Sequence, residues 1–229
     1  KGIEKDFGVN LAAELMKWPD YIAKSGEIIE IPIATGNKGL IRIYLVGVGE
    51  SKRDDYRKAG ISIARKVKGS GQQVALAVVE NRLFIENFVT SLILASYVWN
   101  QKTPKKDEKG ASEFVFIENG KEFAKEINRG VELASGVWSA RDLIHTPSNI
   151  KNPKWLADQA KRLVAATKNS ALSIEIKAGP QLKEFGGLRA VGNSAPNPGP
   201  RFIEIKYRPK GSKSSPHVVL VGKGITYDT

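Results

Sequence analysis

The chain has 229 residues, of which 41% are hydrophobic and 26% are charged, a composition typical of a globular protein that can bury a core. It contains no cysteine and only two histidines, His145 and His217, so disulfides, thiolate metal sites and histidine-based zinc motifs are excluded. The formal net charge of +12 adds nucleic acid to the candidate partners. The lysines are scattered singly or in pairs, however, which is more typical of a solvated surface.

The sequence shows no sign of a membrane segment. No run of 18 apolar residues is present, and no charged segment leads into an apolar one as in a signal peptide. We therefore expect no membrane contact and a cytoplasmic location.

The first part of the chain alternates strand-like and helix-like segments, as in an α/β protein. The predicted elements are strands at 28–34 and 40–48, a helix at 53–67, a strand at 74–79, a helix at 83–99 and a strand at 114–117. Turn-forming glycine and asparagine between the first two strands favour a hairpin. The run 74–79 is continuously apolar, which predicts a strand covered on both faces. The charged segment 101–110 has nothing to bury and is expected to be an exposed loop.

The second part continues the alternation after a long helix. The predicted elements are a helix at 121–144, a helix starting at Pro153, a strand at 172–176, a helix at 181–189 and strands at 202–207 and 218–221. Asn152 and Pro153 are a favourable cap and first residue for the helix that follows them. We expect an N-terminal α/β domain over 1–120, a connecting helix over 121–144 and a second α/β domain over 145–229.

The string VGKGITYDT at 221–229 places a lysine and an aspartate just after an apolar run. Ligand sites of open α/β sheets lie at the carboxyl ends of strands. Gly222 and Gly224 would allow a sharp turn that points Lys223 and Asp228 into one crevice. Taken alone, such a lysine and aspartate are more often solvated than functional. The segment lacks the glycine spacing of a phosphate-binding loop.

Four strings occur in the order found in the leucyl aminopeptidase family, the cytosol aminopeptidases. VGKGITYDT resembles the metal-binding segment of that family, and RDLIHTPSNIKNP at 141–153 looks like the start of its catalytic domain. GGLRAVGNSAPNPGPRFIEIKY at 186–207 is similar to the stretch before the metal loop, and LIRIYLVGVG at 40–49 to a strand of the N-terminal domain. The resemblance implies an N-terminal macro-domain-like α/β domain, a connecting helix and, over 145–229, the beginning of an α/β metallopeptidase domain.

The resemblance also implies roles for individual residues. Lys223 matches a lysine metal ligand, and Asp228 matches an aspartate that bridges two metal ions, zinc or manganese. A metal ion can hold the neutral amine of a lysine by displacing its proton. The family releases N-terminal amino acids from peptides and assembles as hexamers, so peptide substrates and a homo-oligomer are implied. His145 stands where the family more often has asparagine, and both histidines are expected to be structural.

The sequence departs from the family in one respect. The family pattern continues past Thr229 with a catalytic lysine, further acidic ligands and an arginine, so no catalytic residue is assigned here. Two ligands cannot hold a dinuclear centre, because a divalent ion needs four or more donors. We expect the 229-residue chain alone to be inactive and metal-free, and the intact protein to be the aminopeptidase. The alternatives are a basic DNA-binding module, and an assembly or nucleotide-binding role for the N-terminal domain.

Overall fold

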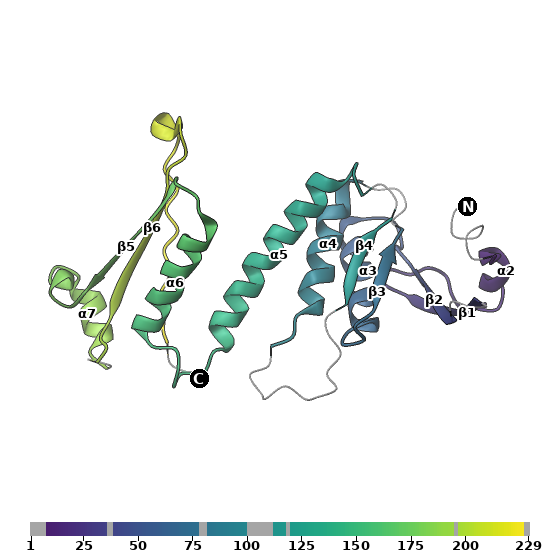
Figure 1. Ribbon diagram of the computed structural model, residues 1–229, viewed down its shortest axis with the longest axis horizontal. Helices are drawn as coiled ribbons and strands as arrows, with labels where there is room; N and C mark the ends of the chain where they lie inside the picture. The colour runs from purple at the N-terminus through teal and green to yellow at the C-terminus, as the bar shows by residue number, and fades with distance from the viewer. Residues whose placement is uncertain are drawn as a thin grey trace. The chain divides into compact units, whose positions relative to one another are not determined.

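The computed structural model describes residues 8–35, 39–77, 82–99, 112–117, 120–194 and 197–226. The chain divides into two compact units, Lys1–Ala140 and Arg141–Thr229, each a mixture of helices and strands (Figure 1). The predicted α/β class is therefore confirmed. The segment 101–110, predicted as a loop, lies outside the described residues. Within the described ranges, no helix is both long enough and apolar enough to cross a membrane.

The first unit opens with a short helix and a hairpin. Its elements are α2 (Leu11–Leu15), β1 (Ile28–Thr35), β2 (Gly39–Val46), α3 (Arg53–Lys66), β3 (Gln73–Leu76), α4 (Arg82–Ser96), β4 (Glu113–Phe116) and α5 (Ala124–His145). Strands β1 and β2 pair antiparallel, with Ile31 opposite Ile43, which confirms the predicted hairpin. Because side chains alternate along a strand, Ile29 and Ile31 are buried on one face of the hairpin. On the other face, Tyr44 packs against the main core.

The main core lies between two helices and a two-stranded parallel sheet. Strands β3 and β4 pair in parallel with α4 as the crossover, as a βαβ unit requires. The core cluster is formed mainly by apolar side chains of α3, α4 and β3: Tyr56, Ala59, Ile63, Ala64, Val67, Val74, Leu76, Ile85, Phe88, Val89 and Leu92, with Phe123. Long apolar stripes on α3 and α4 thus find their partner surface in each other and in one face of the sheet.

The prediction that the strand around 74–79 is covered on both faces is wrong for its described residues. Val74 and Leu76 are buried, but Gln73 and Ala75 are exposed. The helices pack only on the side of Val74 and Leu76, so the alternate positions face away from the core. The continuous apolar run gave no sign of this alternation, because Ala75 is apolar but small enough to be exposed at little cost.

The second unit contains one longer helix beside an antiparallel pair of strands. Its elements after the end of α5 are α6 (Pro153–Thr167), β5 (Leu172–Ala178), the 3₁₀ helix η2 (Gly179–Leu182), α7 (Gly186–Gly192), β6 (Arg201–Tyr207) and the 3₁₀ helix η3 (Ser212–Ser214). The predicted start of α6 is confirmed, because the Asn152 side chain accepts a hydrogen bond of 2.9 Å from the Trp155 N–H and Pro153 is the first helical residue. Helix α6 contacts both β5 and β6.

Two predicted elements of this unit are wrong. The helix expected at 181–189 is divided into η2 and α7 by a break at residues 183–185. The strand expected at 218–221 does not form, and Val218 is 77% exposed and Leu220 93% exposed. Among the described residues no strand pairs with this segment, and a strand needs such a ladder of hydrogen bonds.

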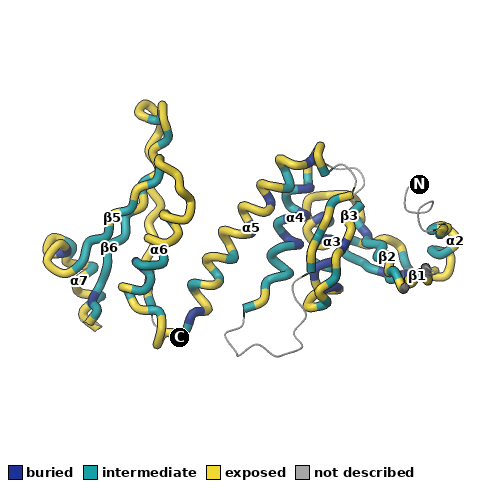
Figure 2. Tube along the Cα trace, viewed as in Figure 1, coloured by how far each residue is buried: buried dark blue, intermediate teal, exposed yellow. Residues whose placement is uncertain are grey.

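Helix α5 corresponds closely to the predicted connecting helix, and it runs across the division between the two units. The predicted boundaries of 1–120, 121–144 and 145–229 stay a prediction. Figure 2 shows that buried positions are much more frequent in the first unit than in the second. Among the described residues of the second unit, the buried apolar side chains are Ala157 and Leu182.

Candidate functional site

Lys223, the described member of the predicted metal pair, lies on a segment without helix or strand. After η3 the chain continues to Thr226 in an irregular conformation. The Lys223 side chain is exposed, as are the apolar residues before it. Asp228, its predicted partner, lies outside the described residues.

The glycines around Lys223 differ in their surroundings. A Cβ atom built on Gly224 would lie 3.0 Å from Cδ2 of Leu156, so the backbone after Lys223 lies against helix α6. A Cβ atom on Gly222 would meet nothing within 4 Å. Neither glycine has a positive φ, so the sharp turn expected from them is not present.

The described side chains offer too few donors for a pair of divalent ions. No group of three or more histidine, cysteine, aspartate or glutamate side chains in the described ranges could hold a metal ion. Lys223 supplies one amine, and a single donor is far from the four or more that a divalent ion needs. The described residues alone therefore do not fit a dinuclear centre, and we derive no catalytic step from them.

The two histidines are far from any metal-ligating arrangement. His145 is the last residue of α5, where a cationic or polar side chain suits the carbonyl end of a helix. His217 is exposed on the irregular segment after η3. That the histidines are structural stays a prediction.

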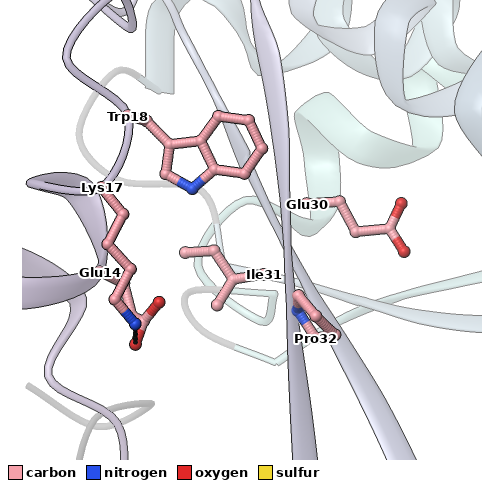
Figure 3. A pocket seen from close by; sticks show the side chains of 6 residues that line it. All are labelled: Glu14, Lys17, Trp18, Glu30, Ile31 and Pro32. Carbon is pink, nitrogen blue, oxygen red and sulfur yellow. Dashed lines mark hydrogen bonds and ion pairs between the residues drawn. The ribbon is translucent and has the colours of Figure 1, made fainter.

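A depression of about 290 Å³ lies in the first unit, between the segment around α2 and strand β1. Figure 3 shows the indole of Trp18 beside Ile31, the ion pair between Glu14 and Lys17 at the rim, and Glu30 pointing to the other side of the strand. The Glu14–Lys17 pair has a 2.7 Å separation and neutralises the rim. The depression contains none of the predicted site residues. It marks the place where the chain before β1 covers the buried face of the hairpin.

Sequence reasoning missed a charged cluster on the opposite face of the hairpin. Glu30 forms ion pairs with Arg42 of β2, at 2.8 Å, and with Lys66 of α3, at 2.9 Å. The Lys66 ammonium also lies over the ring of Tyr44, which is directly opposite Glu30 in the hairpin. Lys66 and Arg42 lower the pKa of Glu30, and Glu30 raises the pKa of Lys66 through their hydrogen bond. The two-residue period of the hairpin was the signal that could have placed these groups on one face.

Comparison with known proteins assigns the chain to a family, which the geometry of the described residues does not do by itself. The profile of the cytosol aminopeptidase family, N-terminal domain, matches residues 9–105, and that of the cytosol aminopeptidase family, catalytic domain, matches residues 138–229. A probable cytosol aminopeptidase of Aquifex aeolicus is 30% identical over 96% of this chain and 45% of its own length. Leucine aminopeptidase 1 of Arabidopsis thaliana is 28% identical over 96% of this chain and 44% of its own length.

Solved structures show the same likeness. A mutant of tomato leucine aminopeptidase superposes with a TM-score of 0.67 and 26% identity, over 89% of this chain and 42% of that one. The bottromycin maturation enzyme BotP in complex with Mn has a TM-score of 0.64 over 86% of this chain and 42% of that one, and at 21% identity it shows the fold alone. The chain spans less than half of the length of each of these proteins. Because profiles of both domains of one family match in order along this chain, the chain belongs to the cytosol, or leucyl, aminopeptidase family.

Proposed function

We propose that the whole protein is a leucyl-type aminopeptidase that uses two divalent metal ions to release N-terminal amino acids from peptides. The observation that carries this proposal is the match of residues 138–229 to the family's catalytic domain. Lys223 and Asp228 lie within that match and are proposed as metal ligands. Manganese and zinc are the candidate ions, and the manganese in the BotP complex supports the first.

The proposal is tested on the whole protein. After removal of metal with a chelator, we expect leucine anilide hydrolysis to return on addition of manganese or zinc. Lys223→Ala should lower both the bound metal, measured by elemental analysis, and the activity by about 100-fold or more, since even outer-shell partners of a metal ligand contribute 10–100-fold. Lys213→Ala, another exposed lysine of the same unit, is the matched control and should change neither.

Two outcomes would contradict the proposal. Absence of hydrolysis by the whole protein with both metals would remove the peptidase function. Unchanged metal content in Lys223→Ala would leave the peptidase in place but remove Lys223 from the ligand set. The 229-residue chain by itself should not hydrolyse the anilide, because its described residues supply one donor. A homohexamer and a cytosolic location are further proposals, which rest on the family resemblance.

A second candidate function is binding of nucleic acid, and one observation favours it. The positive charge is not spread evenly along the chain. Residues 141–229 contain 15 lysines and arginines against six acidic residues, whereas residues 1–140 contain 21 against 18. Three quarters of the net charge of +12 therefore lie in the second unit. Binding to phosphates would show a steep loss of affinity with salt.

The nucleotide-binding alternative for the first unit finds no such support. Helix N-termini that bind phosphate need a local positive field. The first turn of α3 instead carries Asp54 and Asp55. The Asp55 carboxylate accepts a hydrogen bond of 3.0 Å from the Lys52 N–H and so occupies the end of the helix.

A further inference from the structure

The irregular segment that carries Lys223 does not fix its own conformation. Residues 216–226 belong to no helix or strand. Among the described residues, no hydrogen bond involves the backbone of this segment. A backbone without such bonds takes its place from the elements that it touches. Where the Lys223 amine lies is therefore decided by contacts with other parts of the second unit.

A close contact joins this segment to helix α6. A Cβ atom built on Gly224 would lie 3.0 Å from Cδ2 of Leu156, whereas carbon atoms at their best separation lie about 3.5–4.0 Å apart. The backbone directly after Lys223 thus lies against the leucine with room for glycine and for nothing larger. Figure 1 shows the yellow segment passing beside α6.

The position of Leu156 is set by the first turn of α6. The Asn152 side chain accepts a hydrogen bond of 2.9 Å from the Trp155 N–H, and the Asn152 carbonyl accepts one of 3.1 Å from the Leu156 N–H. Pro153 holds the backbone of the first helical residue. Ala157 is buried, and α6 contacts β5 and β6. Leu156 therefore projects from a capped and packed helix, which places a side chain more precisely than a loop does.

We propose that Leu156 is a positioning residue for Lys223: its side chain, packed on Gly224, holds the backbone that carries the lysine. This inference rests on the proposed aminopeptidase function, in which Lys223 is a ligand, and adds a residue that binds nothing itself. The leucine side chain has no polar atom, so its effect on the reaction comes through distance alone. A displacement of about 1 Å in an active site can cost about 100-fold in rate.

Leu163 offers a matched comparison within the same helix. It lies seven residues after Leu156, which is about two turns and about 10 Å along the axis, so it is on the same side of α6. Its side chain is 57% exposed. In the part of the chain that the structure describes, it does not lie within 4 Å of the Cβ position of Gly224. Truncating Leu163 thus removes the same atoms from α6 without removing the contact with Gly224.

The test is a double-mutant cycle in the whole protein. Gly224→Ala adds the methyl group that Leu156 opposes, and Leu156→Ala removes the opposing side chain. Leu163→Ala is the control for the second change. The kcat and KM for leucine anilide are measured for the three single variants, and for Gly224→Ala combined with each leucine substitution in turn.

We expect Gly224→Ala to lower kcat by about 10-fold or more with little change in KM, because the substrate keeps its other contacts. Adding Leu156→Ala should recover most of this loss, since the methyl group then has room, and adding Leu163→Ala should recover none. Additive effects of Gly224→Ala and Leu156→Ala would overturn the inference, as would equal recovery by the two leucine substitutions.

A second measurement does not depend on activity. Amide hydrogen exchange of the peptide over 217–226 is followed by mass spectrometry in the whole protein after metal has been removed with a chelator. Leu156→Ala should make this peptide exchange several-fold faster, and Leu163→Ala should leave its rate unchanged. Unchanged exchange in Leu156→Ala would overturn the inference even if kcat falls.

The two measurements separate the inference from the function on which it rests. If the unaltered protein does not hydrolyse the anilide, the peptidase is excluded, and the exchange result still decides whether Leu156 holds the segment. Circular dichroism checks that the variants are folded. If Leu156→Ala unfolds α6, the smaller truncation Leu156→Val takes its place in the cycle, with Leu163→Val as its control.

Discussion

Two glycines decide how closely the helices of the first unit approach one another. A Cβ atom built on Gly60 of α3 would lie 2.6 Å from the carbonyl oxygen of Phe88 in α4. A Cβ atom on Gly130 of α5 would lie 2.9 Å from the carbonyl oxygen of Glu86, which is also in α4. Both positions need glycine because the backbone of α4 occupies the space of a side chain. Gly136, also in α5, has nothing within 4 Å of its Cβ position.

These surroundings predict opposite effects of the same substitution. Gly60→Ala should lower the free energy of unfolding by about 1–3 kcal/mol, because the backbone of α4 has to move to accept the methyl group. Gly136→Ala, the matched control, should raise it by up to about 1 kcal/mol through helix propensity alone. Urea unfolding of the 229-residue chain, followed by circular dichroism, measures both. Equal effects of the two substitutions would show that close helix packing at Gly60 does not determine the change in unfolding free energy.

At the scale of elements, Glu30 joins three parts of the first unit. Its carboxylate on β1 contacts Arg42 on β2 and Lys66 on α3, so one side chain fastens the hairpin to the helix that covers it. The three groups are partly exposed, and solvent weakens ion pairs of this kind. Their contribution should nevertheless be visible in how stability changes with pH.

The sign of that change follows from the direction of the two pKa shifts. Folding lowers the pKa of Glu30 from its ordinary value of 4.5. Its contribution is therefore fully present at higher pH and is lost as the pH falls through the lowered pKa. Folding raises the pKa of Lys66 above 10.5, so the contribution of the lysine is present below that pH and is lost as the pH rises through the raised pKa.

We expect Glu30→Gln to destabilise the first unit at neutral pH and to have progressively less effect as the pH falls below 4.5. The difference in unfolding free energy between the two proteins, measured by urea titration at several pH values, gives the result. The same substitution in a Lys66→Gln background is the control, and there the pH dependence should shrink. A difference that does not vary with pH would mean that the charge of Glu30 contributes nothing.

The sequence predicted those elements whose signals are local. The hairpin β1–β2 has turn residues between two β-rich runs, and α6 has its asparagine cap and first proline. The helix expected at 181–189 was wrong because the chain leaves the helical conformation at residues 183–185, between η2 and α7, a break that the apolar spacing does not reveal. The strand expected at 218–221 failed because pairing depends on a neighbouring strand, which no local pattern can supply.

The candidate site shows the same division between local and distant information. Lys223 and Asp228 could be singled out because they lie five positions apart in one recognisable string. The orientation of these two side chains could not be predicted from the sequence, because a metal centre takes its donors from several segments that only tertiary structure brings together. The exposed position of Lys223 in the described residues shows how little one string determines by itself.

At the scale of the whole molecule, the two units differ in how they bury apolar surface. The first has a continuous cluster of buried side chains from its helices and strands. In the second, among described residues, only Ala157 and Leu182 are buried apolar residues, while side chains such as Val221 and Tyr207 are 93% and 62% exposed. Burial of apolar surface is the main favourable contribution to folding. The second unit therefore has little that would stabilise it in the 229-residue chain.

We expect the two units of this chain to differ strongly in amide hydrogen exchange. Core amides of α3 and α4 should exchange through cooperative unfolding, and those of α6, β5 and β6 through local opening at much lower free energy. Mass spectrometry of peptides from the exchanged chain measures both sets at once. In the whole protein the same peptides of α6, β5 and β6 should be protected, because further polypeptide would cover their apolar side chains. Equal protection of both units in the 229-residue chain would show that the small core around Ala157 and Leu182 is sufficient, and would contradict the dependence of the second unit on additional contacts.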